Sequence, residues 1–446
     1  MSDDKAAYRL ALARRLLADA HAKLEIQFGF RLWDGSTVPD RWPADALALV
    51  IADEGVLAAL VRRPTLDTAV RLHVEGRLDF ANGTLFDFAS ARPRGKLGRL
   101  LPKLGVLRMA HAAFAFWRAP ADAPVALAAV TEEADARDGS AGVNKRNIAY
   151  HYDVSNGFYR LFLDDQMVYT CGYFAPAWHD DLDRAQRDKL DMICRKLRLA
   201  PGDRLLDIGC GWGALVCHAA QHYGVTALGV TLSEEQAGLA RERAAARGLS
   251  DRVTIALQDY RSVEGQFDKI ASIGMFEHVG IDNHPAYFAT VSRLLRPRGL
   301  YLHHAIARPA KGDDRKFRKM RPEYRALTRY IFPGGELDHI GMSVANLERA
   351  RLEVHDVEGW REHYAHTTRL WFERLSARRA EAIAEVGEDK TRLWLLYLAG
   401  CSLAFERGAV GIYQTLASKR TRGPSGLPST RQDLYAVRDS VDQGTT

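Results

Sequence analysis

The sequence predicts an α/β protein: a Rossmann-like parallel sheet with helices on both faces, joined to a smaller N-terminal α+β domain. Its 446 residues exceed the usual size of one domain, so two folding units are expected. From Leu182 onward, helical segments alternate with short β-branched runs, which is the pattern of a parallel sheet covered by helices. The first 118 residues lack this alternation and are assigned to the smaller domain.

The N-terminal domain is expected to span residues 1–118. Leucines at roughly helical spacing over Tyr8–Leu24 predict a surface helix with one buried side. A second helix is expected to end before Pro64. Apolar and polar residues alternate over Val70–Phe88 around the turn residues Asn82–Gly83, which predicts two antiparallel strands joined by a tight hairpin.

A helix followed by a hairpin resembles the small sterol-carrier-type lipid-binding fold, so the N-terminal domain is a candidate lipid-binding domain. The alternative is a plain α+β domain that serves only in packing or dimerisation, which would make the protein a homodimer. Residues 119–145 are rich in Ala and Asp and are interpreted as a linker. Residues 421–446 are rich in Gly, Ser and charge, which predicts a disordered tail.

The larger domain is expected to span residues 146–420. Helices are predicted between its strands, including Ala214–Tyr223 and Ser233–Arg247. Apolar, β-branched runs predict five strands: Arg204–Ile208, Ala227–Val230, Val253–Gln258, Lys269–Ile273 and Leu300–Ile306. The carboxyl ends of parallel strands meet at one edge of a sheet, and open α/β sheets bind ligands there.

The turn after the first of these strands indicates a nucleotide site. In LLDIGCGWG, Leu205–Gly213, a buried strand leads into a glycine-rich turn that opens a helix. Glycine lets the backbone approach a ligand closely, and a helix N-terminus offers free N–H groups. Asp207 precedes the turn, and Gly209 and Gly211 are the candidates for backbone contacts with the cofactor.

The next two strand ends carry further candidate cofactor-binding residues. Thr231 and Gln236 stand where a dinucleotide fingerprint would place a carboxylate for the ribose. Gln258, Asp259 and Tyr260 follow the third strand and are placed to meet an adenine. A single turn of this kind is better explained as an ordinary strand-to-helix connection. Three such turns, which follow successive strands and meet at one edge of the sheet, predict a nucleotide-type cofactor.

Further motifs are similar to those of cyclopropane-fatty-acyl-phospholipid synthases and mycolic acid cyclopropane synthases. The similarity runs from about Asn147 to Lys419. It is carried by HYDVSNGFYRLFLDDQMVYTCGYF (151–174), LLDIGCGWG (205–213), GVTLSEEQ (229–236), IGMFEHVG (273–280), YIFPGGEL (330–337) and HYAHTTRLWFERL (363–375). The resemblance implies a class I methyltransferase sheet and S-adenosylmethionine as the cofactor. It also implies that Tyr169 and Thr170 contact the sulfonium and the carboxylate of that cofactor, and that Gly209 contacts its methionine part.

The same resemblance implies a lipid-alkylating reaction. The cis double bond of an acyl chain takes the sulfonium methyl group, and the resulting carbocation must lose a proton. The family holds bicarbonate as the base, and its binding residues fall here on Cys171, Glu277, His304, Tyr364 and the backbone amide of Ile306. An anion stabilises a developing cation in a site of low dielectric.

Each of these residues taken singly also fits a structural role, such as a buried cysteine or a core histidine. Their joint occurrence within six matching motifs favours the base site. His303 competes with His304, and the alternation of side chains along a strand favours His304, which shares a face with Ile306.

The predicted partners are unsaturated phospholipid acyl chains at an anionic membrane surface. The net charge of +6 suits either such a surface or nucleic acid, but no RNA-binding module is found, so no nucleic-acid partner is expected. In Lys311–Tyr330, basic residues alternate with the apolar anchors Phe317, Met320, Tyr324 and Leu327. This segment fits an interfacial helix; a solvated charged face is the alternative.

The sequence also predicts where the protein is located and whether it has a metal site. No apolar run approaches the roughly 20 residues of a spanning helix, and the N-terminus lacks the pattern of a secretory signal. We therefore expect a cytoplasmic protein associated peripherally with the inner face of the membrane. The five cysteines form no CxxC pair and no histidine clusters with them, so no metal site is predicted.

Cyclopropanation of phospholipid acyl chains is the favoured activity, and three alternatives stay open. Relatives with this catalytic core also make methyl-branched or methylene fatty acids, and no motif decides which proton the cation loses. A methyltransferase for nucleic acid or a small molecule is more distant. A third alternative is a lipid carrier without catalytic activity, but the presence of all five base-site residues argues against it. The N-terminal part also lacks the glycine- and tryptophan-rich run of the commoner long synthases.

Overall fold

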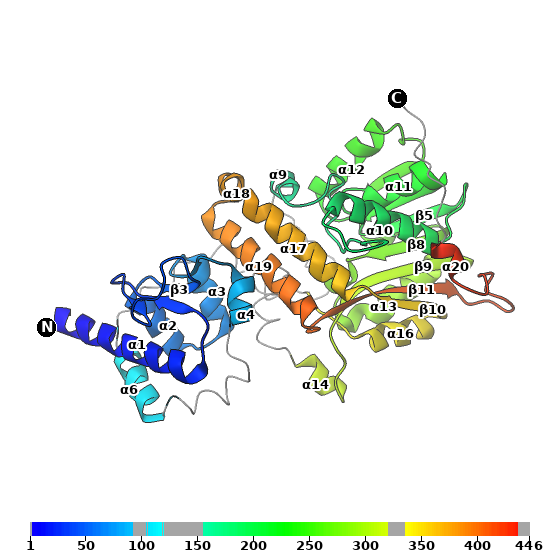
Figure 1. Ribbon diagram of the computed structural model, residues 1–446. Coiled ribbons are helices and arrows are strands. Elements are labelled where there is room, and N and C mark those ends of the chain that lie inside the picture. The colour runs from blue at the N-terminus through cyan, green and yellow to red at the C-terminus, as the bar shows by residue number, and fades with distance from the viewer. Residues whose placement is uncertain are drawn as a thin grey trace. The chain divides into compact units, whose positions relative to one another are not determined.

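A computed structural model of the chain describes residues 2–91, 104, 106–117, 119, 155–319 and 335–435 (Figure 1). The chain divides into two compact units. Unit 1 comprises Met1–Ala134, Lys319–Ile331 and Arg378–Leu403, and unit 2 comprises the rest of the chain. Arg378–Leu403 was predicted to belong to the larger domain, and that prediction is wrong. The predicted linker at 119–145 lies outside the described residues, except for Ala119.

Unit 1 combines a small sheet with helices. Its elements are α1 (Ser2–Leu24), β1 (Gly29–Arg31), β2 (Thr37–Val38), β3 (Ala48–Ile51), α2 (Glu54–Arg62), α3 (Leu66–Val74), β4 (Leu78–Ala81), α4 (Leu85–Ala91), α6 (Val106–Trp117), α18 (Arg379–Val386) and most of α19 (Glu388–Glu406). The strand order is β2-β1-β3-β4. The predicted helices over Tyr8–Leu24 and before Pro64 are confirmed by α1 and α2.

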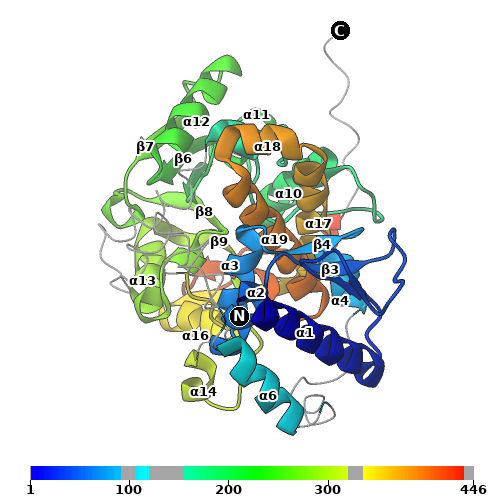
Figure 2. The same ribbon diagram turned by 90° about the vertical axis from the view of Figure 1, so that its left-hand side faces the viewer.

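Buried apolar residues pack the helices of unit 1 together. Ala13 of α1, Ala58 of α2 and Phe116 of α6 form one apolar cluster, and α1 and α6 lie side by side (Figure 2). Helix α19 joins this unit through Arg392, whose guanidinium donates to the backbone oxygen of His73 at 2.8 Å and pairs with Asp79 at 2.8 Å. These contacts explain why a segment so late in the sequence belongs to unit 1.

The hairpin predicted over Val70–Phe88 is wrong. The first part of this run lies in helix α3, which Thr65 caps by accepting a hydrogen bond from the amide of Thr68. Strand β4 follows, but its partner is β3. Asn82 has a left-handed φ of 58°, as a turn requires, yet the chain then enters helix α4. The helix-then-hairpin order that suggested a sterol-carrier-type fold is therefore absent from the described part of unit 1.

Unit 2 is built on a seven-stranded sheet in the order β10-β11-β9-β8-β5-β6-β7. Its strands are β5 (Arg204–Ile208), β6 (Thr226–Thr231), β7 (Val253–Leu257), β8 (Phe267–Ile273), β9 (Leu295–Ala307), β10 (Leu352–Gly359) and β11 (Gly411–Lys419). Strands β5 to β9 are parallel and confirm the five predicted strands. Strands β10 and β11, which pair antiparallel, were not predicted.

Helices cover both faces of this sheet, as predicted (Figure 1). Side chains alternate between the faces of β5: Leu205 belongs to the core formed with α10 (Leu182–Lys196), α11 (Ala214–Tyr223) and α12 (Glu234–Ala246), whereas Leu206 belongs to the core formed with α13 (His284–Leu294) and α16 (Ile340–Arg349). The other α-helices in the described part of this unit are α9 (Asn156–Arg160), α14 (Asp314–Arg318), α17 (Arg361–Ala377) and α20 (Gln432–Tyr435). No helix in the described ranges is long and apolar enough to cross a membrane.

Part of the tail predicted to be disordered is ordered. Residues 421–435 are described, and they include the short helix α20. Leu427 packs against the core of unit 2, and Leu434 is 1% exposed. Arg431 also pairs with Asp356 of β10. The polar composition concealed these anchors, and residues 436–446 of the predicted tail lie outside the described residues.

Candidate functional site

A cavity lies at the carboxyl ends of β5, β6 and β7, where the sequence placed the cofactor. Its wall includes all ten predicted cofactor-binding residues: Tyr169, Thr170, Asp207, Gly209, Gly211, Thr231, Gln236, Gln258, Asp259 and Tyr260. The structure thus brings these residues together from segments up to 91 positions apart, counted from Tyr169 to Tyr260. Their individual contacts with the cofactor stay predictions.

The glycine-rich turn needs glycine for conformation and for space. Gly209 and Gly211 have φ values of 83° and 53°, in the left-handed region. A Cβ on Gly209 would lie 2.8 Å from Cβ and Cγ of Met275, which also lines the cavity. Any side chain at position 209 would therefore push into the cavity wall as well as strain the turn.

The other predicted residues hold one another at the cavity wall. The hydroxyl of Thr231 donates to Oε1 of Gln236 at 2.8 Å, which fixes the orientation of that amide. Asp259 pairs with Arg261 at 2.7 Å and accepts a hydrogen bond from its backbone. Burial tends to raise the pKa of Asp259, but the hydrogen bonds from Arg261 outweigh this effect and hold the pKa below its usual value. Asp259 therefore already has a charged partner beside the place predicted for the adenine.

One residue of the cavity wall, a buried lysine, was not predicted from the sequence. Lys189 of α10 is 1% exposed, lines the cavity, and donates through Nζ to Oγ1 of Thr170 at 2.8 Å. Burial lowers the pKa of Lys189 to about 8, although the nearby carboxylate of Asp164 acts to raise it. Burial raises the pKa of Asp207 to about 7, although the positive charge of Lys189 acts to lower it. One cationic and one acidic group at the same cavity suit an amino-acid moiety, which carries both charges.

The sequence held one signal for this lysine. Gln186, Lys189 and Lys196 recur at helical spacing on the buried side of α10, the side that also carries Leu190 and Ile193. Long polar side chains are almost never fully buried without partners, so their place on an apolar face could have indicated a site.

Two of the predicted base-site residues, Cys171 and His304, contact Trp360 through their side chains, and Trp360 is 1% exposed and directly precedes α17, the helix that carries Tyr364. Sγ of Cys171 lies 3.8 Å from the backbone oxygen of Trp360, and the amide of Tyr364 donates to the same oxygen at 3.1 Å. The rings of His304 and Trp360 pack edge to face, with their centroids 5.4 Å apart. Trp360 thus ties together β9, α17 and the loop that carries Cys171.

Glu277 joins this region through β9. It lies in the short 3-10 helix Phe276–His278 after β8, and its Oε1 accepts a hydrogen bond from the amide of Ile306 at 2.7 Å. The Ile306 amide was predicted to bind the anion, but in this structure it is engaged by Glu277 instead. The second oxygen, Oε2, is buried and has no hydrogen-bond partner among the described residues. Burial raises the pKa of Glu277 to about 7.

The two adjacent histidines on β9 have different environments, and the role predicted for His304 stays a prediction. Nδ1 of His303 lies 3.0 Å from the hydroxyl of Tyr301 and Nε2 lies 3.5 Å from that of Ser343, so His303 is held in the core. His304 has its Nδ1 within 3.1 Å of the amide of Gln414, while its buried Nε2 has no partner in the described ranges.

These orphaned atoms fit a small anion that also carries a hydroxyl group. Nε2 of His304 can donate to such an ion, and Oε2 of Glu277 can accept from it. Unpaired polar atoms that are buried destabilise a protein by roughly 1–3 kcal/mol each, so an anion that pairs with either atom would relieve such a cost. The residues present therefore fit bicarbonate.

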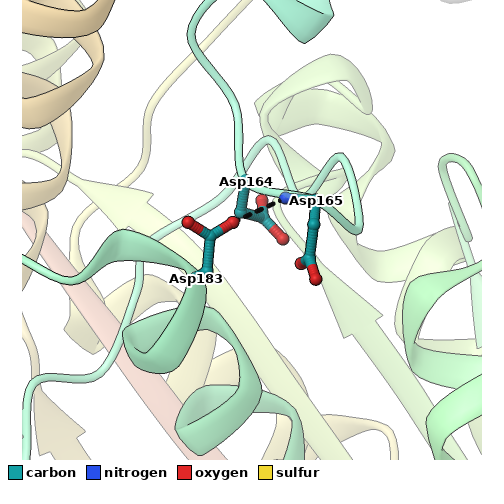
Figure 3. A group of neighbouring side chains, drawn as sticks. All are labelled: Asp164, Asp165 and Asp183. Atoms are coloured by element: carbon teal, nitrogen blue, oxygen red, sulfur yellow. Dashed lines mark hydrogen bonds between the residues drawn. The ribbon is translucent and has the colours of Figure 1, made fainter.

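Three carboxylates gather beside the loop that leads to the cavity, those of Asp164, Asp165 and Asp183 (Figure 3). Asp164 accepts a hydrogen bond from the amide of Val168 at 2.7 Å. Asp183 accepts from the amide of Asp165 at 2.7 Å and pairs with Arg374 at 2.8 Å. These contacts hold the loop in place, which explains the acidic cluster without a metal.

The basic segment predicted over Lys311–Tyr330 is described only in part. Arg315 and Lys316 of α14 are exposed. Phe317 is 1% exposed, so it is not available as an apolar membrane anchor and that part of the prediction is wrong. The other predicted anchors, Met320, Tyr324 and Leu327, lie outside the described residues.

The family model for mycolic acid cyclopropane synthetase matches residues 140–415, more than half of the chain. The chain belongs to this family. The resemblance drawn from the motifs is confirmed, and so is the class I methyltransferase sheet. The protein is an S-adenosylmethionine-dependent methyltransferase.

Relatives of two kinds support this assignment. A protein of Pseudomonas putida named "Probable fatty acid methyltransferase" is 38% identical over 427 residues, which cover 94% of this chain and 99% of that protein. The cyclopropane-fatty-acyl-phospholipid synthase of Escherichia coli (strain K12) is 40% identical over 269 residues, 60% of this chain and 66% of its own.

Two solved structures of family members match the fold. The cyclopropane synthase MmaA2 from Mycobacterium tuberculosis is 32% identical, with a TM-score of 0.57, over 62% of this chain and 98% of its own. The mycolic acid cyclopropane synthase CmaA1, solved with SAH and CTAB, is 34% identical, with a TM-score of 0.58, over the same shares.

Proposed function

We propose that this methyltransferase transfers a methylene unit from S-adenosylmethionine to the cis double bond of unsaturated acyl chains in membrane phospholipids, forming cyclopropane fatty acids. The observation that carries the proposal is the contact of the Cys171 and His304 side chains with Trp360, the residue that precedes the helix bearing Tyr364. The Escherichia coli and mycobacterial relatives support it, because both are named as cyclopropane synthases.

The proposed reaction has two bond-making steps. The π electrons of the double bond form a bond to the sulfonium methyl carbon, and the carbon–sulfur bond breaks, leaving S-adenosylhomocysteine and a carbocation. A proton then leaves the transferred methyl group, and the electrons of that C–H bond close the three-membered ring. Burial of the base-site side chains keeps water, which would trap the cation, away from this chemistry.

We further propose that bicarbonate is held as the base at this site. When bound, it supplies the group that takes the proton. The thiol of Cys171, the hydroxyl of Tyr364 and Nε2–H of His304 would donate hydrogen bonds to it, and Oε2 of Glu277 would accept its hydroxyl proton. Burial raises the pKa of the Cys171 thiol, so the residue is suited to donating a hydrogen bond rather than to attacking as a thiolate.

A second candidate product is a methyl-branched or methylene fatty acid. The name of the Pseudomonas putida relative, a fatty acid methyltransferase, favours this alternative. The same alkylation would precede it. Loss of a proton from a neighbouring chain carbon would leave a methyl-branched alkene, whereas a 1,2-hydride shift followed by loss of a proton from the transferred methyl group would leave an exocyclic methylene.

A cytoplasmic location at the inner membrane face is also proposed. Exposed Arg315 and Lys316 support contact with anionic headgroups, since each cation near such a surface contributes about 1 kcal/mol. We also propose that the N-terminal unit forms a homodimer, which is the dimerisation role considered for that unit.

The experiment that tests the function is analysis of membrane lipids from cells that express the chain. Mass spectrometry is expected to show unsaturated acyl chains that have gained one methylene unit, and proton NMR to show cyclopropane ring protons. The gain without ring protons would support the branched product. An unchanged lipid profile from a folded, S-adenosylmethionine-binding protein would refute lipid alkylation.

A further inference from the structure

Three side chains form a row across the antiparallel side of the sheet. Glu358 on β10, Gln414 on β11 and His304 on β9 are direct cross-strand partners, and directly opposed residues of neighbouring strands share one face. Lys196, the last residue of α10, reaches this row and is 1% exposed. A buried cation therefore lies next to the candidate base site.

Lys196 connects the first two members of the row. Its Nζ forms an ion pair with Glu358 and donates to Oε1 of Gln414 at 2.7 Å. Burial lowers the pKa of Lys196, but the carboxylate of Glu358 opposes that shift and favours the charged form. An ammonium group has three donors and no acceptor, so the atom of Gln414 that it contacts must be the carbonyl oxygen.

The other end of the Gln414 amide then decides where the proton of His304 sits. Nε2 of Gln414 lies 3.1 Å from Nδ1 of His304. An amide NH2 group only donates, so Nδ1 must accept and carries no proton. Burial, together with the charges of Lys189 and Lys196, lowers the pKa of His304 well below its usual value and keeps the ring neutral. A neutral imidazole without a proton on Nδ1 carries it on Nε2.

We propose that Lys196 and Gln414 are positioning residues that hold His304 in its Nε2–H tautomer. The orphaned Nε2 of His304 thereby presents a hydrogen-bond donor to the base site. The opposite tautomer would present a lone pair, which repels an anion. The role of the tautomer in turnover rests on the proposed function, whereas the tautomer itself is a property of the free enzyme.

The first test reads the tautomer directly. Enzyme labelled with 15N-histidine is examined by long-range 1H–15N NMR in bicarbonate-free buffer, and the His304 signals are assigned by their loss in a His304→Asn variant. The expected spectrum shows a protonated Nε2 and an unprotonated Nδ1. A protonated Nδ1 in the parent enzyme would overturn the proposal, whatever the base of the reaction is.

The second test asks what sets the tautomer. Lys196→Met and Gln414→Met each remove one link of the chain, and the nitrogen shifts of His304 should then move toward the averaged values of a tautomer mixture. Lys269→Met is the matched control, because Lys269 is another largely buried lysine of this sheet, 4.0 Å from Asp203. Unchanged shifts in a folded Lys196→Met or Gln414→Met protein would overturn the proposal; if one variant fails to fold, the other decides.

The third readout separates positioning from folding and from the identity of the base. Both variants are expected to lose about tenfold in kcat, as for one hydrogen bond, with unchanged S-adenosylmethionine affinity, while Lys269→Met keeps parental kcat. A parental kcat in a variant whose tautomer is mixed would refute the role in turnover. A correct tautomer in an enzyme that is indifferent to bicarbonate would instead refute only the proposed base.

Discussion

The backbone amide of Ile306 donates to Oε1 of Glu277 at 2.7 Å and so joins the end of β9 to the short helix that follows β8. This contact holds the carboxylate in place and leaves its second oxygen buried without a partner in the part of the chain that the structure describes. Glu277 is not among the residues that line the cofactor cavity, so its predicted role is at the base site and not in cofactor binding.

Replacing Glu277 with Gln tests that separation. The amide retains the shape of the side chain, but its NH2 end can no longer accept the proton of the bound ion. We expect kcat to fall about tenfold or more, while calorimetry shows unchanged affinity for S-adenosylmethionine. A loss of cofactor affinity equal to the loss of turnover would instead place Glu277 in the cofactor site.

Gly209→Val tests the glycine-rich turn. A branched side chain at a left-handed φ costs roughly 1–3 kcal/mol, and its Cβ would lie 2.8 Å from Met275. We expect S-adenosylmethionine affinity, measured by calorimetry, to fall roughly 10- to 100-fold or more. Gly238→Val is the control, because Gly238 lies in α12 and a Cβ there meets no atom within 4 Å. Parental affinity in Gly209→Val would rule out this turn as the binding site.

Lys189 should give cofactor binding a pH dependence. Burial lowers its pKa to about 8, so the side chain is cationic below that pH and neutral above it. If its charge attracts the cofactor carboxylate, affinity falls as the pH rises through about 8. We expect Lys189→Met to weaken binding about tenfold near pH 7 and to lose this alkaline component. Calorimetric titrations of both proteins between pH 6 and 9 check it, and an identical pH profile in the variant would contradict the assignment.

Membrane association should depend on charge. Binding to anionic vesicles is expected to weaken as salt rises and to weaken further in Arg315→Gln/Lys316→Gln, by about 1 kcal/mol per lost cation. The matched control is Arg184→Gln/Arg187→Gln, which removes two half-exposed cations of α10. Sedimentation with vesicles measures both. Equal binding of the parent enzyme to neutral and anionic vesicles would speak against an electrostatic contact.

Much of unit 2 was predictable because its signals are local. Each parallel strand is a short apolar run followed by a characteristic turn, so the cofactor cavity could be assembled from strand ends such as Asp207 and Thr231. Strands β10 and β11 gave no such signal, because their antiparallel pairing joins residues far apart in sequence. The contact of Lys196 with Gln414 spans 218 positions, and no motif could reveal it.

Unit 1 shows the opposite failure, in which a local signal was misleading. Alternation over Val70–Phe88 and the Asn82–Gly83 turn predicted a hairpin, but Leu72 and Val74 are buried residues of helix α3 instead. Short apolar runs are compatible with either period, and tertiary packing decides between them. The prediction of a disordered tail failed for a similar reason, because Leu427 and Leu434 anchor a segment whose composition is polar.

The most direct test of the central claim is turnover in bicarbonate-depleted buffer, measured for the parent enzyme and for Cys171→Ser. Parent turnover should fall on depletion and recover when bicarbonate is added back. Cys171→Ser should keep partial activity, because a hydroxyl can replace the thiol as a hydrogen-bond donor, whereas a covalent cysteine mechanism would make the change nearly lethal. Full activity of the parent without bicarbonate, together with an inactive Cys171→Ser enzyme, would contradict a bound ion as the base.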